Sequence, residues 1–291
     1  MDMVPFDDRD GFIWMNGAFS PWRETKVHVL THGLHYGSAV FEGERAYSGE
    51  IFKSLEHSER LHNSARILGF DIPFSVEQIE DAKREALARS GLDSAYVRAI
   101  AWRGSEMMGV SAQNNRINLA IAVWEWGDYF ADKMKGIRMT HAQWKRPSPE
   151  TAPCDSKAAG LYMICTLSKH AAERAGYADA LMLDWRGQVA EATGANVFFV
   201  RDGAIHTPTP DCFLNGITRR TIIGLAEARQ MEVIERAIMP DELPTFSECF
   251  ITGTAAELTP VAEIADVSYK PGALTETLIH DYDRLVNRKA P

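Results

Sequence analysis

The sequence predicts a mixed α/β (α+β) protein built from two domains. Its 291 residues reach the length at which chains usually split into domains. Strand-like and helix-like patterns alternate along both halves, and a polar stretch without apolar periodicity separates the halves at residues 127–136. We therefore expect a small N-terminal α/β domain over residues 1–127, a linker over 128–136 and a large C-terminal domain over 137–291.

Turn signals and apolar runs predict the strands of the first domain. An Asn-Gly pair at 16–17 lies between two short apolar runs, which is the strongest short-range signal of a β-hairpin. A Ser-Gly pair at 48–49 joins two more strand-like runs in the same way. The apolar runs 95–102 and 117–124 are rich in β-branched residues and predict buried strands.

Two helices are expected between these strands. An apolar stripe with helical spacing ends at Gly69, a residue type that often stops a helix. Ser75 and Gln78 have the spacing of a capping box, which predicts the start of the second helix, and this helix ends near Gly91.

The second domain also mixes strands and helices. A helical pattern runs from Ala158 to a stop at Gly176, and two further helical patterns cover 219–229 and 274–287. Strand-like runs are expected at 137–141, 180–183, 197–200, 233–236 and 249–251.

Composition and charge exclude several classes of function. The chain has 40 acidic and 31 basic residues, and its formal charge of -9 repels nucleic-acid backbones. No apolar run approaches the roughly 20 residues that cross a bilayer, and the acidic start does not resemble a secretory signal, so we expect a cytoplasmic protein without membrane partners. Irregular spacing of the 4 cysteines and of the histidines predicts neither disulfides nor a metal site.

Three stretches of the second half are rich in Gly, Thr and other small residues: 191–196, 215–219 and 252–257. Such stretches at strand ends allow a ligand to approach the backbone. In the second stretch Thr218 is the expected N-cap of a helix, so free amides and the helix dipole would point at an anion. An ordinary helix cap after a loop is the alternative interpretation.

Eight short motifs follow one another at 32–43 (HGLHYGSAVFEG), 60–62 (RLH), 96–98 (YVR), 108–110 (MGV), 157–162 (KAAGLY), 191–196 (EATGAN), 216–219 (GITR) and 253–257 (GTAAE). In this order they resemble the fold-type IV pyridoxal-phosphate enzymes and, among these, the branched-chain aminotransferases. The resemblance covers nearly the whole chain. It implies a two-domain fold with pyridoxal 5'-phosphate at the domain interface.

The resemblance implies transamination between branched-chain L-amino acids (leucine, isoleucine, valine) and 2-oxoglutarate, which gives branched 2-oxo acids and L-glutamate, in branched-chain amino acid biosynthesis. It also implies a homodimer or higher homo-oligomer. Alternatives on the same fold are a D-amino acid or (R)-amine aminotransferase, an aminodeoxychorismate lyase, and a non-catalytic relative. The motifs at 96–98 and 108–110 favour the branched-chain group. The joint retention of Lys157, Glu191, Arg60 and Tyr162 argues against a non-catalytic protein.

Each cofactor residue is implied by its place in a motif. Lys157 corresponds to the lysine that binds the cofactor covalently and moves the substrate proton, and burial would lower its pKa enough for both roles. Glu191 corresponds to the partner of the pyridine nitrogen, and Tyr162 to the partner of the phenolic oxygen, with a core tyrosine as the alternative. The remaining expected cofactor residues are Arg60, Asn196, the amides of Ile217 and Thr218, and Thr254.

The expected substrate residues form a polar part and an apolar part. Tyr96 and Arg98 alternate on a strand and therefore share a face, which suits a grip on a carboxylate. In the family that the sequence resembles, Tyr36 and Val110 come from the neighbouring subunit. Core packing is the alternative for each aromatic residue. The other expected substrate residues are Phe41, Gly43, Met108, Trp126, Thr254 and Ala255.

Two residues depart from the family pattern. Asp155 lies two places before Lys157, so on a strand it would face the same way and favour the ammonium form of the lysine. Glu44 replaces the apolar residue that is usual in the family, which leaves the size and polarity of the pocket rim open.

Overall fold

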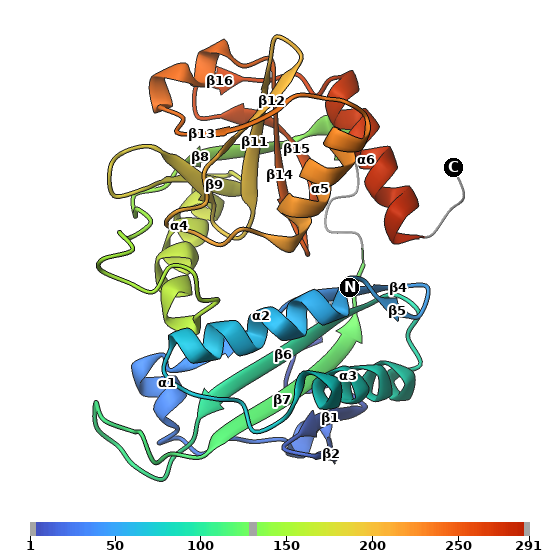
Figure 1. Cartoon of the computed structure of the whole chain (residues 1–291), viewed down its shortest axis with the longest axis vertical. Helices are drawn as coiled ribbons and strands as arrows, with labels where there is room; N and C mark the ends of the chain where they lie inside the picture. The colour runs from blue at the N-terminus through green and yellow to red at the C-terminus, as the bar shows by residue number, and fades with distance from the viewer. Residues whose placement is uncertain (1–3, 128–132, 288–291) are drawn as a thin grey trace. The chain divides into compact units, whose positions relative to one another are not determined.

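The computed structural model describes residues 4–127 and 133–287 (Figure 1). The chain forms two compact units, Met1–Gly127 with Ser156–Gly160, and Asp128–Asp155 with Leu161–Pro291. The short excursion at Ser156–Gly160 differs from the expected division, which assigned it to the second domain. Of the expected linker, residues 128–132 lie outside the described residues, and a 3-10 helix occupies Lys133–Lys135.

The first unit is built on a seven-stranded sheet in the order β2-β1-β7-β6-β4-β5, with β3 also paired to β6. Asn16 and Gly17 have φ of 52° and 97°, the left-handed conformation that a tight hairpin turn needs, which confirms the expected first hairpin. The pair at 48–49 turns the second hairpin in the same conformation. The strands are β1 (Phe12–Met15), β2 (Ala18–Pro21), β3 (Ala39–Phe41), β4 (Glu44–Tyr47), β5 (Glu50–Ile51), β6 (Ala95–Arg103) and β7 (Ile117–Glu125).

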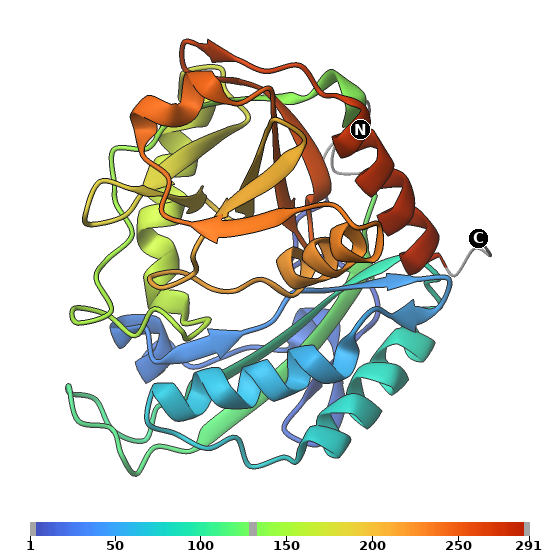
Figure 2. The same ribbon diagram turned by 45° about the horizontal axis from the view of Figure 1, so that its top comes forward.

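Helices α2 (Ser54–Ile67) and α3 (Val76–Ser90) pack against each other and cover one face of this sheet (Figures 1 and 2). The capping box is formed as expected, because Ser75 Oγ accepts from the Gln78 amide and Gln78 Oε1 accepts from the Ser75 amide. A short helix, α1 (His32–Tyr36), precedes β3 and was not expected from the sequence, because five residues show no periodicity.

The interior of the first unit contains a charged network between α3 and β4. Lys83 is fully buried, and its Nζ lies 2.8 Å from Glu44 Oε2 and 2.8 Å from Glu80 Oε1. Burial raises the pKa of the Glu44 carboxyl, against the opposing effect of Lys83. The Glu44 side chain is therefore buried in the core of this unit.

The second unit contains a nine-stranded sheet in the order β10-β9-β8-β15-β14-β11-β12-β13, with β16 also paired to β15. An additional pairing of β10 with β11 joins two strands of this path, so β10, β9, β8, β15, β14 and β11 close into a barrel. The strands are β8 (Ile137–His141), β9 (Asp179–Leu183), β10 (Val189–Ala192), β11 (Asn196–Arg201), β12 (Ala204–Pro208), β13 (Val233–Arg236), β14 (Glu248–Gly253), β15 (Glu257–Ile264) and β16 (Val267–Ser268).

The five strands expected in this unit are present, whereas β10, β12, β15 and β16 were missed. Their sequences, such as VAEA and ELTPVAEI, mix small, charged and proline residues and lack a continuous apolar run. The mixed α/β class is confirmed.

Three helices accompany the barrel. α4 (Tyr162–Arg174) contacts β8 and β9, while α5 (Ile217–Ala228) and α6 (Ala273–Val286) pack together against β14 (Figure 1). α4 begins later than expected, because Ala158 forms a bridge with Val40 and Ala159–Leu161 is a 3-10 turn. Within the described residues, no helix combines the length and the apolar character needed to cross a membrane.

We predict that Lys83→Met strongly destabilises the protein, because it leaves the fully buried carboxylate of Glu44 and the partly buried one of Glu80 without their cation. Loss of one partner from such a network costs about 3–5 kcal/mol. Urea unfolding would measure this change. The neighbouring Arg84→Ala is the control, since Arg84 pairs with Asp81 at the surface and should change stability by less than about 1 kcal/mol. Similar small effects of both variants would contradict the prediction.

Candidate functional site

The three small-residue stretches meet at one end of the barrel in the second unit, and the first of them forms its closing hairpin. Glu191 and Asn196 are directly paired across β10 and β11, and the Ala192 amide donates to Ala195 O at 2.8 Å. Residues opposite each other on paired strands point to the same face. Accordingly, Asn196 Nδ2 donates to Glu191 Oε2 at 3.2 Å, which orients the carboxylate.

Asn196 also holds the segment before α5. Its Nδ2 donates to Leu214 O at 3.0 Å, and its Oδ1 accepts from the Gly216 amide at 3.2 Å. A Cβ at Gly216 would lie 2.3 Å from that oxygen, so only glycine fits this close approach.

The first turn of α5 is open to an anion. The N-cap is Gly216 and the helix starts at Ile217, so the expectation that Thr218 caps the helix is wrong. No side chain of the described residues caps α5. Because the first amides of a helix have no partner within it, those of Ile217 and Thr218 can bind an anion such as a phosphate.

The turn between β14 and β15 lies beside the closing hairpin. Asn196 is paired with Thr252, and a Cβ at Gly253 would contact Gly194 O at 3.3 Å. Residues 254–256 form the turn itself. A cavity of about 300 Å³ in this unit is lined by Tyr162, Thr193, Gly194, Ala195, Ala255 and Ala256, among others, so Tyr162 joins the same end of the barrel.

Arg146 is a site residue that the sequence did not reveal. Its guanidinium Nε lies 3.4 Å from Glu191 Oε1, and the side chain is buried. Burial opposes its charge, yet Glu191 holds the pKa of the guanidinium above its usual value. Glu191 is thus contacted through both oxygens, by Arg146 and Asn196. Arg146 follows β8 in an irregular loop beside Lys145, where no pattern distinguishes the two cations.

In the first unit, hydrogen bonds fix the backbone of Lys157. Its amide donates to Ser64 Oγ of α2 at 3.0 Å, and its carbonyl accepts from the Phe41 amide at 3.2 Å. Its Nζ lies 5.1 Å from the centre of the Phe41 ring. Asp155 lies in a turn and is exposed, so the expectation based on strand alternation before Lys157 does not apply.

Several expected substrate residues come together beside Phe41. The Arg98 guanidinium lies 4.7 Å from the centre of the Phe41 ring, and its Nη2 donates to the Tyr96 hydroxyl at 3.3 Å. Trp126 lies against the Tyr96 ring at 4.7 Å between centroids. A Cβ at Gly43 would lie 1.9 Å from the Tyr96 hydroxyl, so this position requires glycine.

Three other expected substrate residues lie on the surface of the first unit. Tyr36, Met108 and Val110 are 49%, 44% and 88% exposed. The His32 ring stacks on Tyr36, and its Nε2 lies 2.8 Å from Gly109 O, which connects α1 to the loop that carries the other two.

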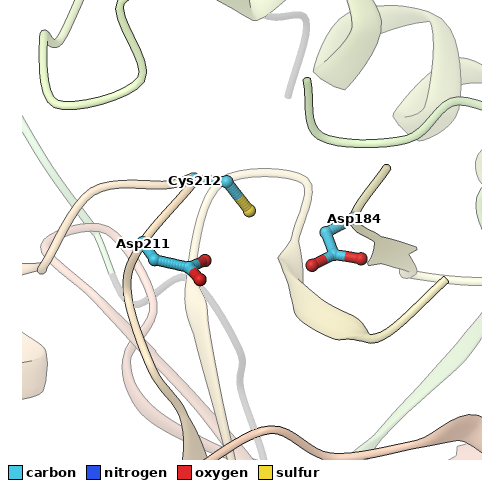
Figure 3. A group of neighbouring side chains, drawn as sticks. All are labelled: Asp184, Asp211 and Cys212. Carbon is cyan, nitrogen blue, oxygen red and sulfur yellow. The ribbon is translucent and has the colours of Figure 1, made fainter. Parts of the chain in front are cut away.

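A group of possible metal ligands, Asp184, Asp211 and Cys212, lies apart in sequence from these motifs (Figure 3). Arg186 donates to Asp184 Oδ2 at 2.7 Å and to Asp211 Oδ1 at 2.9 Å. Burial, together with Asp184 and Asp211, raises the pKa of the Cys212 thiol to about 12. Arg186 thus forms ion pairs with both carboxylates of this group.

Comparison with known proteins identifies the family. The family model for amino-transferase class IV matches residues 39–264, which include the Lys157 segment, the closing hairpin and the start of α5. The chain belongs to the class IV aminotransferases. This membership confirms the resemblance drawn from the eight motifs.

Relatives of this class IV aminotransferase match it over nearly its whole length. The branched-chain-amino-acid aminotransferase of Pseudomonas aeruginosa is 40% identical, over 97% of this chain and 95% of that protein. The solved branched-chain aminotransferase of Thermoproteus uzoniensis with norvaline is 34% identical and superposes with a TM-score of 0.93, over 97% of this chain and 96% of that one. The branched-chain amino acid aminotransferase of Thermobaculum terrenum, solved in its PLP form, is 29% identical, with a TM-score of 0.88 over 97% of this chain and 95% of that one.

We predict that Gly216→Ala destabilises this aminotransferase by about 1–3 kcal/mol, because the new Cβ overlaps Asn196 Oδ1. Urea unfolding would measure the loss. Gly224→Ala in the same helix is the control, since open space surrounds that position and alanine favours helix. Combining Gly216→Ala with Asn196→Ala should remove most of the additional cost, and an undiminished cost would argue against the overlap with Asn196.

Proposed function

We propose that this aminotransferase transfers the amino group of leucine, isoleucine or valine to 2-oxoglutarate, with pyridoxal 5'-phosphate as cofactor. The observation that carries the proposal is the convergence of an oriented carboxylate, Glu191, and the uncapped start of α5 at one end of the barrel. A phosphorylated pyridine requires both features, an acidic partner for its nitrogen and a site for its phosphate. The names of the relatives support the substrate class and the cofactor.

Each unit contains residues with the chemistry that this cofactor requires. In the second unit, Glu191 would bind the pyridine nitrogen and Tyr162 the phenolic oxygen, while Asn196 keeps Glu191 and α5 in place. The phosphate would be held by the amides of Ile217 and Thr218 together with Thr254, and by Arg60 of the first unit. When bound, pyridoxal phosphate supplies an electron sink for the carbanion formed at the substrate Cα.

Lys157 would hold the cofactor and move the proton at the substrate Cα. Its backbone is fixed to α2 and β3 at the same time, so the root of the side chain has one position. The Phe41 ring lies beside Nζ and limits the directions in which the side chain can extend from that root.

Arg98 and its neighbours would recognise the substrate side chain. Its Nε is buried and lacks a hydrogen-bond partner among the described residues, which suits an incoming carboxylate such as that of 2-oxoglutarate. The aromatic rings of Phe41, Tyr96 and Trp126 offer an apolar surface to a branched side chain. The amides of the turn at Thr254 and Ala255 would bind the α-carboxylate.

We propose that the protein acts as a homodimer in the cytoplasm. The exposed apolar side chains of Tyr36, Met108 and Val110 would be covered by a second copy, which would place them in its substrate pocket. The cytoplasmic location is supported by four free, buried cysteines.

We predict that the purified protein transaminates L-leucine with 2-oxoglutarate and that Lys157→Ala abolishes this turnover while leaving a folded protein. Lys145→Ala is the control, because Lys145 is exposed and neighbours the site only in sequence. Parallel assays with D-alanine and pyruvate, an (R)-amine, and aminodeoxychorismate separate the related activities. Retained turnover in Lys157→Ala, or a preference for one of these alternative substrates, would refute the proposal.

We predict that Arg98→Ala raises the apparent KM for 2-oxoglutarate by at least about tenfold and changes the half-reaction with leucine much less. Removal of one member of a buried charge pair costs about 2–5 kcal/mol, and a leucine side chain offers no charge to Arg98. Half-reaction kinetics with leucine and glutamate measure the difference. Arg103→Ala on the same strand is the control, because Arg103 binds backbone carbonyls. Equal losses for both substrates would assign Arg98 to the α-carboxylate instead.

A further inference from the structure

Glu42 is a fully buried carboxylate in the short link between β3 and β4. Its amide donates to Ala99 O of β6 at 2.8 Å, so its backbone is fixed to the central strand. Its Oε1 accepts from Arg60 Nε at 2.7 Å, and its Oε2 accepts from Arg60 Nη2 at 2.8 Å. His57 Nδ1 lies 2.6 Å from the same Oε2. This two-point contact fixes both the position and the plane of the Arg60 guanidinium.

The charge of Glu42 is stabilised in spite of its burial. Burial alone would raise the pKa of the carboxyl, but Arg60 and His57 hold that pKa well below its usual range. Glu42 therefore remains an anion at neutral pH. An ionised carboxylate with 1% of its side chain exposed has little freedom to rotate, and it can hold a cation in one orientation.

The neighbouring Glu44 has similar burial but a different partner. Its cation, Lys83, has a side chain that is 0% exposed, so this ion pair stabilises the interior of the unit. Arg60 instead keeps 16% of its side chain exposed, and Glu42 contacts its guanidinium through Nε and Nη2. The ion pair of Glu44 with Lys83 is therefore closed to solvent on both sides. The ion pair of Glu42 with Arg60 has a partly exposed cation.

We propose that Glu42 is a positioning residue for the cofactor phosphate, which it serves by fixing the orientation of Arg60. The inference rests on the proposed function, because Arg60 belongs to the phosphate-binding residues named there. Arg60 alone carries the charge, but a flexible arginine would lose conformational freedom on each binding event. Held by Glu42, the guanidinium is oriented before the phosphate arrives, and His57 restrains Glu42 in turn.

The test compares binding of pyridoxal 5'-phosphate with binding of pyridoxal, which lacks the phosphate. Dissociation constants are measured by titration of the cofactor-free full chain, followed by absorbance. We expect Glu42→Gln to weaken binding of pyridoxal 5'-phosphate by at least about tenfold, as expected for a weakened buried charge pair, and to change pyridoxal binding by less than about twofold. Glu42→Asp, which keeps the charge but withdraws the carboxylate, should show the same selective loss.

Two controls distinguish positioning from general damage to the fold. Glu44→Gln removes the neighbouring buried carboxylate and should leave the ratio of the two dissociation constants unchanged, even if it lowers stability. In a protein that already carries Arg60→Gln, adding Glu42→Gln should cause no further loss of selectivity for the phosphate, since Glu42 acts through Arg60.

Equal losses for both ligands, or additive losses in the double variant, would overturn the inference. A wild-type protein that binds pyridoxal 5'-phosphate no better than pyridoxal would overturn the proposed function instead, because Arg60 would then have no phosphate to bind. A variant that is destabilised in urea but keeps its selectivity for the phosphate would show that Glu42 only supports the fold.

Discussion

The site of the second unit depends on the hydrogen bonds of one buried amide, that of Asn196. This side chain bonds to Glu191 of the adjacent strand, to a carbonyl before α5 and to the amide of its N-cap residue. An amide can do this because it carries both donors and an acceptor, whereas a carboxylate only accepts. Through it, the carboxylate of Glu191 and the anion-binding helix end share one support. Gly216 leaves the space that the amide oxygen occupies.

In the first unit, hydrogen bonds to the backbone hold Lys157 in place. Lys157 lies outside regular secondary structure, yet Ser64 of α2 and Phe41 of β3 hold its peptide groups. The Phe41 ring also contacts Arg98. The lysine and the arginine proposed to bind substrate are therefore both in contact with the same residue of β3. Such support from rigid elements limits how far a reactive group can move from its working position.

The sequence allowed most elements of the fold to be predicted and candidate site residues to be named, because periodicity, turn pairs and motifs are local signals. The failures at the candidate site share a physical cause, which is that contacts between residues distant in sequence determine the local structure there. Thr218 has the right chemistry for an N-cap, but Asn196, distant in sequence, bonds to the amide of Gly216 instead. Arg146 and Glu42 are buried charges whose partners come from other elements, and nothing in their neighbouring residues indicates such pairing.

The closing hairpin of the barrel has a consequence for the order in which the protein folds. Glu191 and Asn196 are joined by a short turn, so their pairing requires little loss of chain entropy. The parallel pairing of β8 with β15 instead connects segments from nearly opposite ends of the second unit. Long-range parallel pairing is intrinsically slow to form. Glu191 therefore lies in a hairpin that can form early in folding, whereas the pairing of β8 with β15 completes the barrel later.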